Sequence, residues 1–530
     1  MTIRKQLPAR ARVDQLKKQA KDLLAELRAG STEAIERFRA SHPRWVNLKN
    51  QSKPLLADAQ LVVAREYGFT SWTKLRSRVE AIDLDDPVTA FVEAACVPMD
   101  GASHTAGTLD RAEAILRAHP EVAESDIYVA SILGNDAAVQ RFLKQGGEGA
   151  TATGGLYDWD ALTYLCFSRY LRLDRARGDG FLRTARLLLE HGASANTGFY
   201  SQGHEPDPAF ETAIYGAAGI ARHAELTRLL LAHGADPNDG ETPYHVPEGY
   251  DNATLEALVE SGKVDQAGIT TMLHRKHDWH DYQGIEWLLA HGADPNEMSA
   301  WGRRALHKAL DRNNPVRFVE LLLDRGADPK LPTKNGMSAV VVAARMGRGD
   351  VLDLFARRGI SIELEGEDAL LAACAHADEA GARAIVQRAP GIVASIERED
   401  PAIVADVAGA GNTAAVRLML DLGFSAASRT NRAGAPNDTA LHSAVWRSRH
   451  ETAKLLVERG APLEVTNDRG ETPLSYAVRA LVQSEWPAQR SPETVAMLLD
   501  AGARVESVTL FPSGVEEVDE LLRRHGKVSG

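Results

Sequence analysis

The stretch LLAHGADPN occurs twice in this chain, at Leu230–Asn238 and at Leu288–Asn296. Its glycine follows an apolar run, and glycine readily adopts the left-handed conformation that ends a helix. Similar glycines recur downstream at intervals of 34, 33, 32 and 32 residues: Gly292, Gly326, Gly359, Gly391 and Gly423. These intervals predict an array of repeats of about 33 residues.

A second motif lies upstream of the recurring glycines and predicts the start of a helix. It is GETPYH at 240–245, DTALHSAV at 438–445 and GETPLSYAV at 470–478. Threonine caps the free amides of a helix start, and proline suits the first helical turn. Together the two motifs resemble the ankyrin repeat over roughly residues 85–530. The resemblance implies an all-α ankyrin-repeat solenoid of helix-turn-helix units with short β-turn loops.

The two copies of LLAHGADPN are 58 residues apart, which corresponds to two repeats rather than one. Gly262 provides the intermediate helix end. The segment GETPYHVPEGYDN at 240–252 contains Pro247, and a proline interrupts a helix. We therefore predict a repeat with a shortened first helix between the two copies.

Three parts are predicted along the chain. They are a basic N-terminal helical domain at 1–84, divergent ankyrin-like repeats with insertions at 85–200, and ankyrin repeats with a C-terminal capping helix at 201–530. Residues 1–80 contain 17 Lys and Arg against 8 Asp and Glu, whereas the whole chain has a net charge of −12. The first part resembles segments that precede bacterial ankyrin arrays, and this resemblance implies no activity.

Within the N-terminal part, apolar periodicity predicts a helix at 11–30 that ends at Gly30 and a second helix at 31–40 that is capped by Ser31. Two more helices are expected within 56–82, hinged at Gly68.

Composition favours a soluble globular protein of the cytoplasm. The three cysteines, Cys96, Cys166 and Cys374, are far apart, which indicates a reducing compartment. The N-terminus lacks the apolar core of a signal peptide, and no apolar run is long enough to span a membrane. We expect a cytoplasmic protein with no membrane partner and no cofactor.

No P-loop, nucleophile elbow or CxxC motif is present. The strongest metal candidates are His274, His277 and His280, because their spacing places three imidazoles along one side of a helix. The repeat register favours a different interpretation. Counting back from Gly292 places His274 at the ordinary histidine position of a repeat, Asp278–Trp279 at an exposed helix end and His280 in a turn. We therefore predict no metal site and no catalytic residue.

The leading hypothesis is a non-catalytic scaffold that binds another protein or peptide on the concave ankyrin face. In arrays of this kind, the turn tips and the exposed end of each first helix line that face, and Trp and Arg dominate interface hot spots. The predicted partner-binding residues are Trp279, Trp301, Arg303, Arg312, Arg345, Met346, Trp446, Arg447, Arg469 and Arg479. The corresponding positions of one repeat are Gly409 and Ala410, which would leave a dip for an acidic or C-terminal peptide.

A second hypothesis stays open beside this one. The irregular repeats at about 157–282 are rich in Tyr and His, and insertions in regular arrays often carry function. An enzyme or a small-molecule or metal-binding protein would have its site there, lined by Tyr157, Trp159, Tyr164, His204, Tyr244, His245, Tyr250, His277 and His280. Nucleic acid is disfavoured as a partner, because the acidic body of the chain would repel phosphate.

Overall fold

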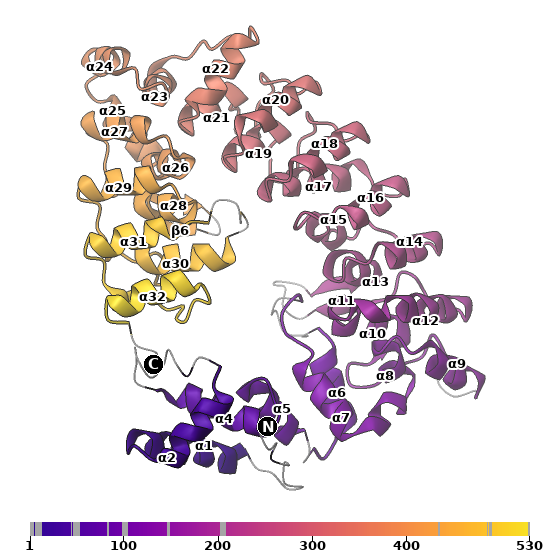
Figure 1. Ribbon diagram of the computed structural model, residues 1–530. Coiled ribbons are helices and arrows are strands. Elements are labelled where there is room, and N and C mark those ends of the chain that lie inside the picture. Colours follow the sequence, from indigo (N-terminus) through magenta and orange to yellow (C-terminus); the bar gives the residue numbers. More distant parts are fainter. Residues whose placement is uncertain are drawn as a thin grey trace. The chain divides into compact units, whose positions relative to one another are not determined.

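The computed structural model describes the chain apart from residues 1–4, 6–12, 44, 46–53, 82–83, 98–103, 146–148, 202–207, 433–434, 485, 487–489 and 528–530. The chain divides into two compact units. Unit 1 comprises Met1–Val246 with Asn252–Val264, and unit 2 comprises Pro247–Asp251 with Asp265–Gly530. Both units are built mainly from helices (Figure 1), and the predicted all-α class is confirmed. The division falls in the repeat that is predicted to have a shortened first helix.

The N-terminal part of unit 1 contains helices that share a core of their own (Figure 1). They are α1 (Val13–Arg28), α2 (Thr32–Ser41), α4 (Leu56–Glu66) and α5 (Trp72–Glu80). Ser31 caps α2, because its hydroxyl accepts a hydrogen bond of 3.4 Å from the amide of Ala34. Gly30 and Gly68 follow α1 and α4 with φ of 80° and 85°. The predicted helices, the serine cap and the hinge at Gly68 are confirmed.

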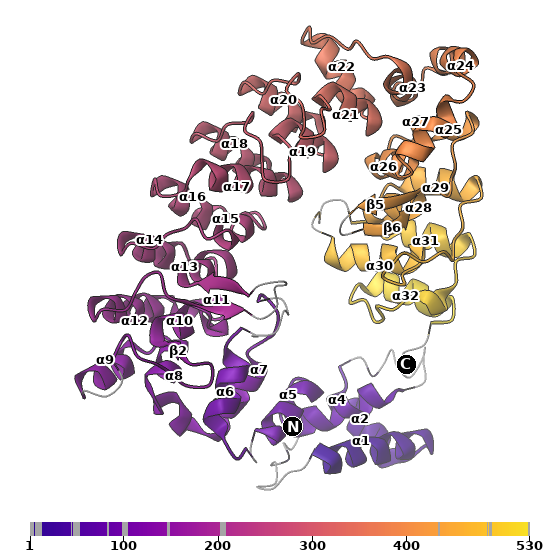
Figure 2. The ribbon, with the colours of Figure 1, turned by 180° about the vertical axis from the view of Figure 1, so that it is seen from behind.

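In the remaining described residues of unit 1, helices alternate with two β-hairpins. Its elements are α6 (Pro87–Ala95), α7 (Asp110–Ala118), η1 (Pro120–Glu124), α8 (Ile127–Ile132), α9 (Asp136–Lys144), β1 (Thr153–Gly154), β2 (Trp159–Asp160), α10 (Ala161–Cys166), α11 (Arg169–Leu173), η2 (Arg175–Arg177), α12 (Gly178–Glu190), β3 (Gly198–Ser201), β4 (Ala209–Thr212), α13 (Ala213–Tyr215), η3 (Gly216–Ile220), α14 (Ala224–Ala232), α15 (Glu241–His245) and α16 (Ala253–Glu260). Figure 2 shows α12, α14 and α16 following one another as the second helices of successive repeats.

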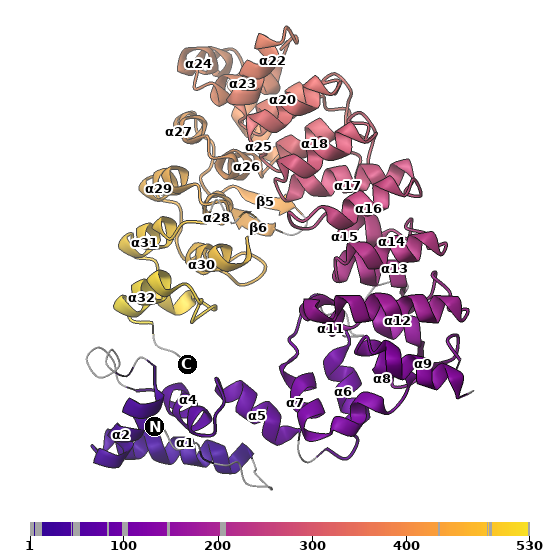
Figure 3. The same cartoon turned by 45° about the vertical axis from the view of Figure 1, so that its right-hand side comes forward.

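Unit 2 contains the more regular helix pairs. Its elements are α17 (Gln266–Asp278), α18 (Tyr282–Ala290), α19 (Ala305–Asp311), α20 (Val316–Asp324), α21 (Ala339–Arg345), α22 (Gly349–Arg357), α23 (Gly366–Ala375), α24 (Glu379–Arg388), α25 (Ile392–Glu399), α26 (Ile403–Ala410), α27 (Thr413–Asp421), β5 (Arg429–Arg432), β6 (Ala435–Thr439), α28 (Ala440–Trp446), α29 (His450–Glu458), α30 (Pro473–Gln483), α31 (Glu493–Asp500), η5 (Val505–Ser507) and α32 (Glu516–Arg524). Figure 3 shows the first helices α26, α28 and α30 in one row and the second helices α27, α29 and α31 in another.

The recurring letters have the structural roles that their chemistry predicts. The hydroxyls of Thr439 and Thr472 each accept a hydrogen bond of 3.3 Å from an amide in the first turn of α28 or α30. Gly234 and Gly292, in the two copies of LLAHGADPN, have φ of 92° and 97°. This left-handed conformation ends the helix, because other residues adopt it only at a steric cost.

The asparagine of LLAHGADPN does more than start a turn, since it connects neighbouring repeats. The Asn296 side chain donates a hydrogen bond of 2.8 Å to the carbonyl of Gly326 and accepts one of 2.7 Å from the amide of Asp328. Asn196 makes the corresponding pair of bonds to Gly234 and Asp236, at 2.9 and 2.8 Å. Each turn therefore satisfies backbone groups at the end of the next second helix.

Two repeats depart from the regular pattern. The shortened first helix is confirmed, because α15 ends at His245 and no helix forms between it and Ala253. The expectation that Gly391 ends a second helix is wrong. Helix α24 already ends at Arg388, and Gly391 has φ of −93° at the start of α25. An additional helix therefore occupies the place of the usual turn.

Two connections between helices form β-hairpins. Strands β3 and β4 pair antiparallel from Gly198 with Thr212 to Ser201 with Ala209. Strands β5 and β6 pair before α28, and their side chains at Thr430 and Asp438 reach the cavity described below. No described helix is long and apolar enough to cross a membrane.

Candidate partner-binding cavity

Unit 2 contains a cavity of about 890 Å³. One side is formed by α17, α19 and the turn before α19, and the other by α26, α28, α30 and the hairpin β5–β6. The lining residues are His274, Trp301, Arg303, Lys308, Asp311, Arg312, Ala405, Asp406, Gly409, Thr430, Asp438, Ser443, Trp446, Arg447, Arg469, Tyr476, Arg479, Gln483 and Trp486. The cavity thus brings together first helices and turns of repeats that are far apart in the sequence.

Most of the predicted partner-binding residues lie in this lining. They are Trp301, Arg303, Arg312, Trp446, Arg447, Arg469 and Arg479. Gly409, at the predicted dip, also lines the cavity, and a side chain there would lie 3.4 Å from the guanidinium of Arg447. The repeat register therefore identified side chains that the fold gathers in one place.

Three predicted residues lie elsewhere. Met346 is only 3% exposed, because it packs inward at the end of α21, and its side chain is not accessible to a partner. Arg345 forms an ion pair of 2.8 Å with Asp368, and neither Arg345 nor Trp279 belongs to the cavity lining.

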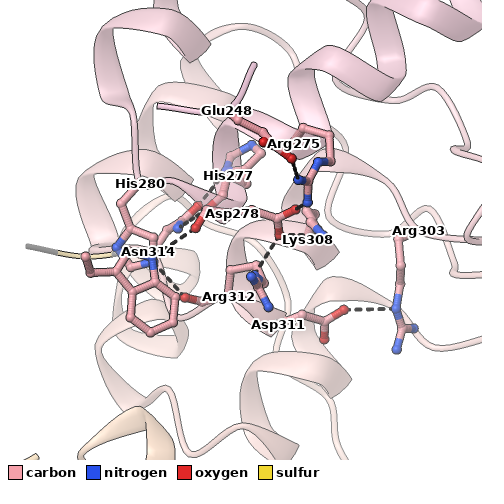
Figure 4. Close-up of polar contacts among 11 residues, drawn as sticks. Glu248, Arg275, His277, Asp278, His280, Arg303, Lys308, Asp311, Arg312 and Asn314 are labelled. Carbon is pink, nitrogen blue, oxygen red and sulfur yellow. Dashed lines mark hydrogen bonds and ion pairs between the residues drawn. The ribbon is translucent and has the colours of Figure 1, made fainter. Parts of the chain in front are cut away.

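Asp278, the last residue of α17, is the centre of a buried ion network (Figure 4). Its Oδ1 lies 2.7 Å from both Lys308 Nζ and Arg312 Nε, and its Oδ2 lies 2.6 Å from Arg275 Nη1. Arg275 is held in turn by Glu248, at 2.8 Å. The predicted exposure of Asp278 is wrong, because only 3% of the residue is exposed.

The charge state of Asp278 follows from this network. Burial raises the pKa of its carboxyl, but the neighbouring Arg312 and Lys308 charges outweigh burial and hold the pKa below its usual range. The carboxylate is therefore ionised at neutral pH. It fixes the positions of Lys308 and Arg312, which both line the cavity.

The three histidines of the metal hypothesis make separate contacts. His277 is buried, and its Nδ1 lies 2.5 Å from Asn314 Oδ1. His280, in the left-handed turn with φ of 53°, donates from Nε2 to the carbonyl of Arg312 at 2.9 Å. His274 is buried beside Trp301. Among the residues that the structure describes, no group of three His, Cys, Asp or Glu is placed to hold a metal.

Burial governs the protonation of these histidines. It lowers the pKa of His274 to about 3 and the pKa values of His277 and His280 to about 4. All three are neutral at physiological pH, which suits their roles as hydrogen-bonding and packing groups inside the repeat.

Aromatic rings support several of the cavity cations. Trp446 stacks on Tyr476 at a centroid distance of 4.7 Å, and the Arg479 guanidinium lies 4.7 Å from each ring centre. Arg479 also donates from Nε and Nη2 to the two carboxylate oxygens of Glu471, both at 2.8 Å. The Arg479 guanidinium is therefore held both by the two aromatic rings and by the Glu471 carboxylate.

Trp486 was not among the predicted binding residues. Its indole N–H donates a hydrogen bond of 2.9 Å to the carbonyl of Asp278, which is 208 residues away in the sequence. The guanidinium carbons of Arg312 and Arg447 lie 5.9 and 5.5 Å from its ring centre. No pattern in the sequence predicts that Trp486 contacts a repeat so far away in the chain.

None of the described residues of the second hypothesis lines the cavity. In unit 1, Trp159 stacks on Phe199 at 4.3 Å and lies 4.8 Å from Tyr157 and 5.1 Å from Tyr164. Trp159 and Tyr164 are buried in this aromatic core. His204 lies outside the described residues.

The free cysteines are also buried groups of the core. Burial raises the pKa of the Cys374 thiol to about 12, and it raises the pKa values of Cys96 and Cys166 as well. All three thiols are protonated at neutral pH and poorly nucleophilic.

Comparison with known proteins agrees with the architecture. Residues 273–366 and 402–509 match the family model of ankyrin repeats in three copies, and the gap between the matches contains the additional helix α25. Ankyrin repeat and KH domain-containing protein mask-1 of Caenorhabditis elegans is 26% identical over 309 residues, which cover 58% of this chain and 10% of that protein.

Ankyrin repeat and SOCS box protein 16 of Mus musculus is 27% identical over 265 residues, which cover 49% of this chain and 51% of that protein. The chain thus spans about half of the second relative and a tenth of the first. The crystal structure of the human ASB11 ankyrin repeat domain is 18% identical and covers 49% of this chain and 99% of that chain, with a TM-score of 0.23. The paired helices, the recurring glycine-asparagine turns and the family match together show that the chain contains ankyrin repeats, at 273–366 and 402–509.

Proposed function

We propose that this chain is a non-catalytic interaction module that binds a segment of a partner protein in the cavity of unit 2. Ankyrin repeats are general protein-protein interaction modules. The observation that carries the proposal is the gathering of three tryptophans and five arginines around a single cavity. Trp and Arg combine a large contact area with directional hydrogen bonding, and they dominate the energetics of protein interfaces.

The size and the polarity of the cavity support a peptide segment as the occupant. A volume of about 890 Å³ lies within the range of ligand-binding pockets. Trp301 is 49% exposed, so an apolar contact surface is already available without rearrangement. The buried, reduced cysteines support a cytoplasmic location for this interaction.

Selection of peptides from a random display library on the full-length chain tests the proposal. We expect the selected peptides to lose binding to Trp301→Ala and Arg447→Gln, which remove side chains that line the cavity. Arg345→Gln is the matched control, because Arg345 lies at the end of a first helix outside the cavity.

Two results would contradict the proposal. One is a set of selected peptides that binds the two cavity variants as tightly as the unchanged chain. The other is a small molecule or metal bound in stoichiometric amount in native mass spectra of the purified chain, with loss of that ligand in the cavity variants. The second result would favour the ligand-binding hypothesis instead.

A further inference from the structure

The cavity lining has a charge opposite to that of the chain. Six cationic side chains line it against three aspartates, whereas the chain as a whole has a net charge of −12. Two carboxylates beside the lining, Asp278 and Glu471, pair with three of these cations, which leaves six cations against five carboxylates. Charges more than about 10 Å apart are largely screened at physiological salt, so this local excess acts on a bound ligand more than the net charge of the chain does. The cavity therefore favours an anionic ligand despite the acidity of the chain.

Two of these cations, Arg303 and Arg312, each have an aspartate oxygen close to Nε. Arg303 Nε lies 3.0 Å from Asp311 Oδ2, and Arg312 Nε lies 2.7 Å from Asp278 Oδ1. For neither guanidinium does the described part of the chain supply a polar partner to Nη1 or Nη2. Figure 4 shows the terminal nitrogens of Arg303 turned away from Asp311. Each arginine therefore keeps its terminal pair of donors for another group.

The geometry of these donors selects the chemistry of the ligand. The terminal edge of a guanidinium presents two parallel N–H groups that match the two oxygens of a carboxylate. Asp311 and Asp278 already fix the two arginines, so less side-chain freedom is lost when a ligand binds. The lining thus provides two preorganised carboxylate positions in one cavity.

We infer that the occupant of the cavity is an acidic peptide segment, with one Asp or Glu side chain on Arg303 and another on Arg312. Trp301 and Trp446 line the same cavity and supply apolar contacts for the residues between the two acids. This inference rests on the proposed function, because it specifies the chemistry of the partner segment in the same cavity.

The test compares two fluorescent peptides that differ only in charge, one of alternating Gly and Glu and the other of alternating Gly and Gln. Their binding to the full-length chain is measured by fluorescence anisotropy. We expect the Glu peptide to bind at least about tenfold more tightly, since charge-assisted hydrogen bonds are about twice as strong as neutral ones. The difference should decrease as the salt concentration rises.

Substitutions of single arginines test which side chains cause the tighter binding of the Glu peptide. Arg303→Gln and Arg312→Gln should each weaken binding of the Glu peptide about tenfold, and Arg303→Lys should weaken it as well, because lysine keeps the charge without the paired donors. Arg345→Gln should change nothing, although Arg345 contacts Asp368 through Nε in the same manner. Arg303 is the decisive position, because the loss of Arg312 also perturbs the buried Asp278.

The outcomes separate this inference from the proposed function. Equal binding of the Glu and Gln peptides, with both weakened by Trp301→Ala, would overturn the acidic partner but leave a peptide-binding cavity. Failure of the Glu peptide to bind would also overturn the inference, and the display selection would then decide the proposed function alone. Equally tight binding of single-stranded DNA would show a general polyanion site and would overturn the inference too.

Discussion

Asp278 decides the chemistry of the cavity at the scale of single residues. The repeat register correctly placed it at the end of a first helix, but it predicted an exposed side chain. Burial follows instead from Lys308 and Arg312 on the next repeat and from Arg275 on its own helix. A sequence pattern fixes the position of a residue within its repeat, whereas the partners of its side chain depend on how the neighbouring repeat presents its charges.

Replacement of this carboxylate should destabilise the fold. Asp278→Asn leaves three neighbouring cations without their common counter-ion, and we expect a loss of about 2–3 kcal/mol in the free energy of unfolding. The loss is at the low end for a buried pair, because Arg312 remains 32% exposed and keeps part of its hydration. Denaturant unfolding measures the change.

Asp311→Asn is the matched control for that substitution. The Asp311 side chain is 20% exposed and has one cation as its partner, so its loss should cost under about 1 kcal/mol. Equal destabilisation by Asp278→Asn and Asp311→Asn would show that the buried network has no special role.

The buried histidines predict a dependence of stability on pH. The pKa values of His277 and His280 in the folded chain are about 4, whereas an unfolded histidine has a pKa of about 6.5. Between these values the unfolded chain binds protons that the folded chain does not. Stability should therefore fall as the pH decreases from about 6.5 to 4, by up to about 1.4 kcal/mol per histidine and pH unit.

His280→Asn isolates one of these contributions. Asparagine suits the left-handed conformation of His280, because Asn313 occupies the corresponding turn of the next repeat with φ of 52°. Thermal unfolding across this pH range should show a smaller loss of stability in the variant than in the unchanged chain. Identical acid dependence in both proteins would contradict the assignment.

At the scale of elements, the turns that end the second helices were the most predictable part of the molecule. The glycines, the threonine caps and the helix pairs all follow from local chemistry, so the sequence alone was sufficient to predict them. Helix α25 was not predictable in this way. Gly391 has the correct spacing, but the spacing does not reveal that the backbone there has already left α24 and begun another helix.

The two kinds of glycine predict different responses to substitution. Gly326 has φ of 86° and Gly391 has φ of −93°, and an added Cβ would meet no atom within 4 Å at either position. Gly326→Ala should therefore cost about 1–2 kcal/mol of unfolding free energy through backbone strain alone. Gly391→Ala should be neutral or stabilising by up to about 1 kcal/mol, because it restricts only the unfolded chain. Similar losses in both variants, measured by denaturant unfolding, would contradict this explanation.

At the scale of the whole molecule, the repeats explain why part of the candidate site could be predicted and part could not. Each repeat specifies contacts with its neighbours, so the register identified seven residues that line the cavity of unit 2. The repeat pattern does not predict contacts between distant repeats. The bond from Trp486 to Asp278 joins residues 208 positions apart, and no local periodicity indicates it.

Photocross-linking tests the central claim, that the cavity of unit 2 receives the partner segment. Trp301 in one protein and Arg345 in another are replaced by a photoreactive benzoylphenylalanine, and each protein is irradiated with a display-selected peptide. We predict a cross-link from position 301 and none from position 345. A cross-link from position 345 with none from position 301 would contradict the account.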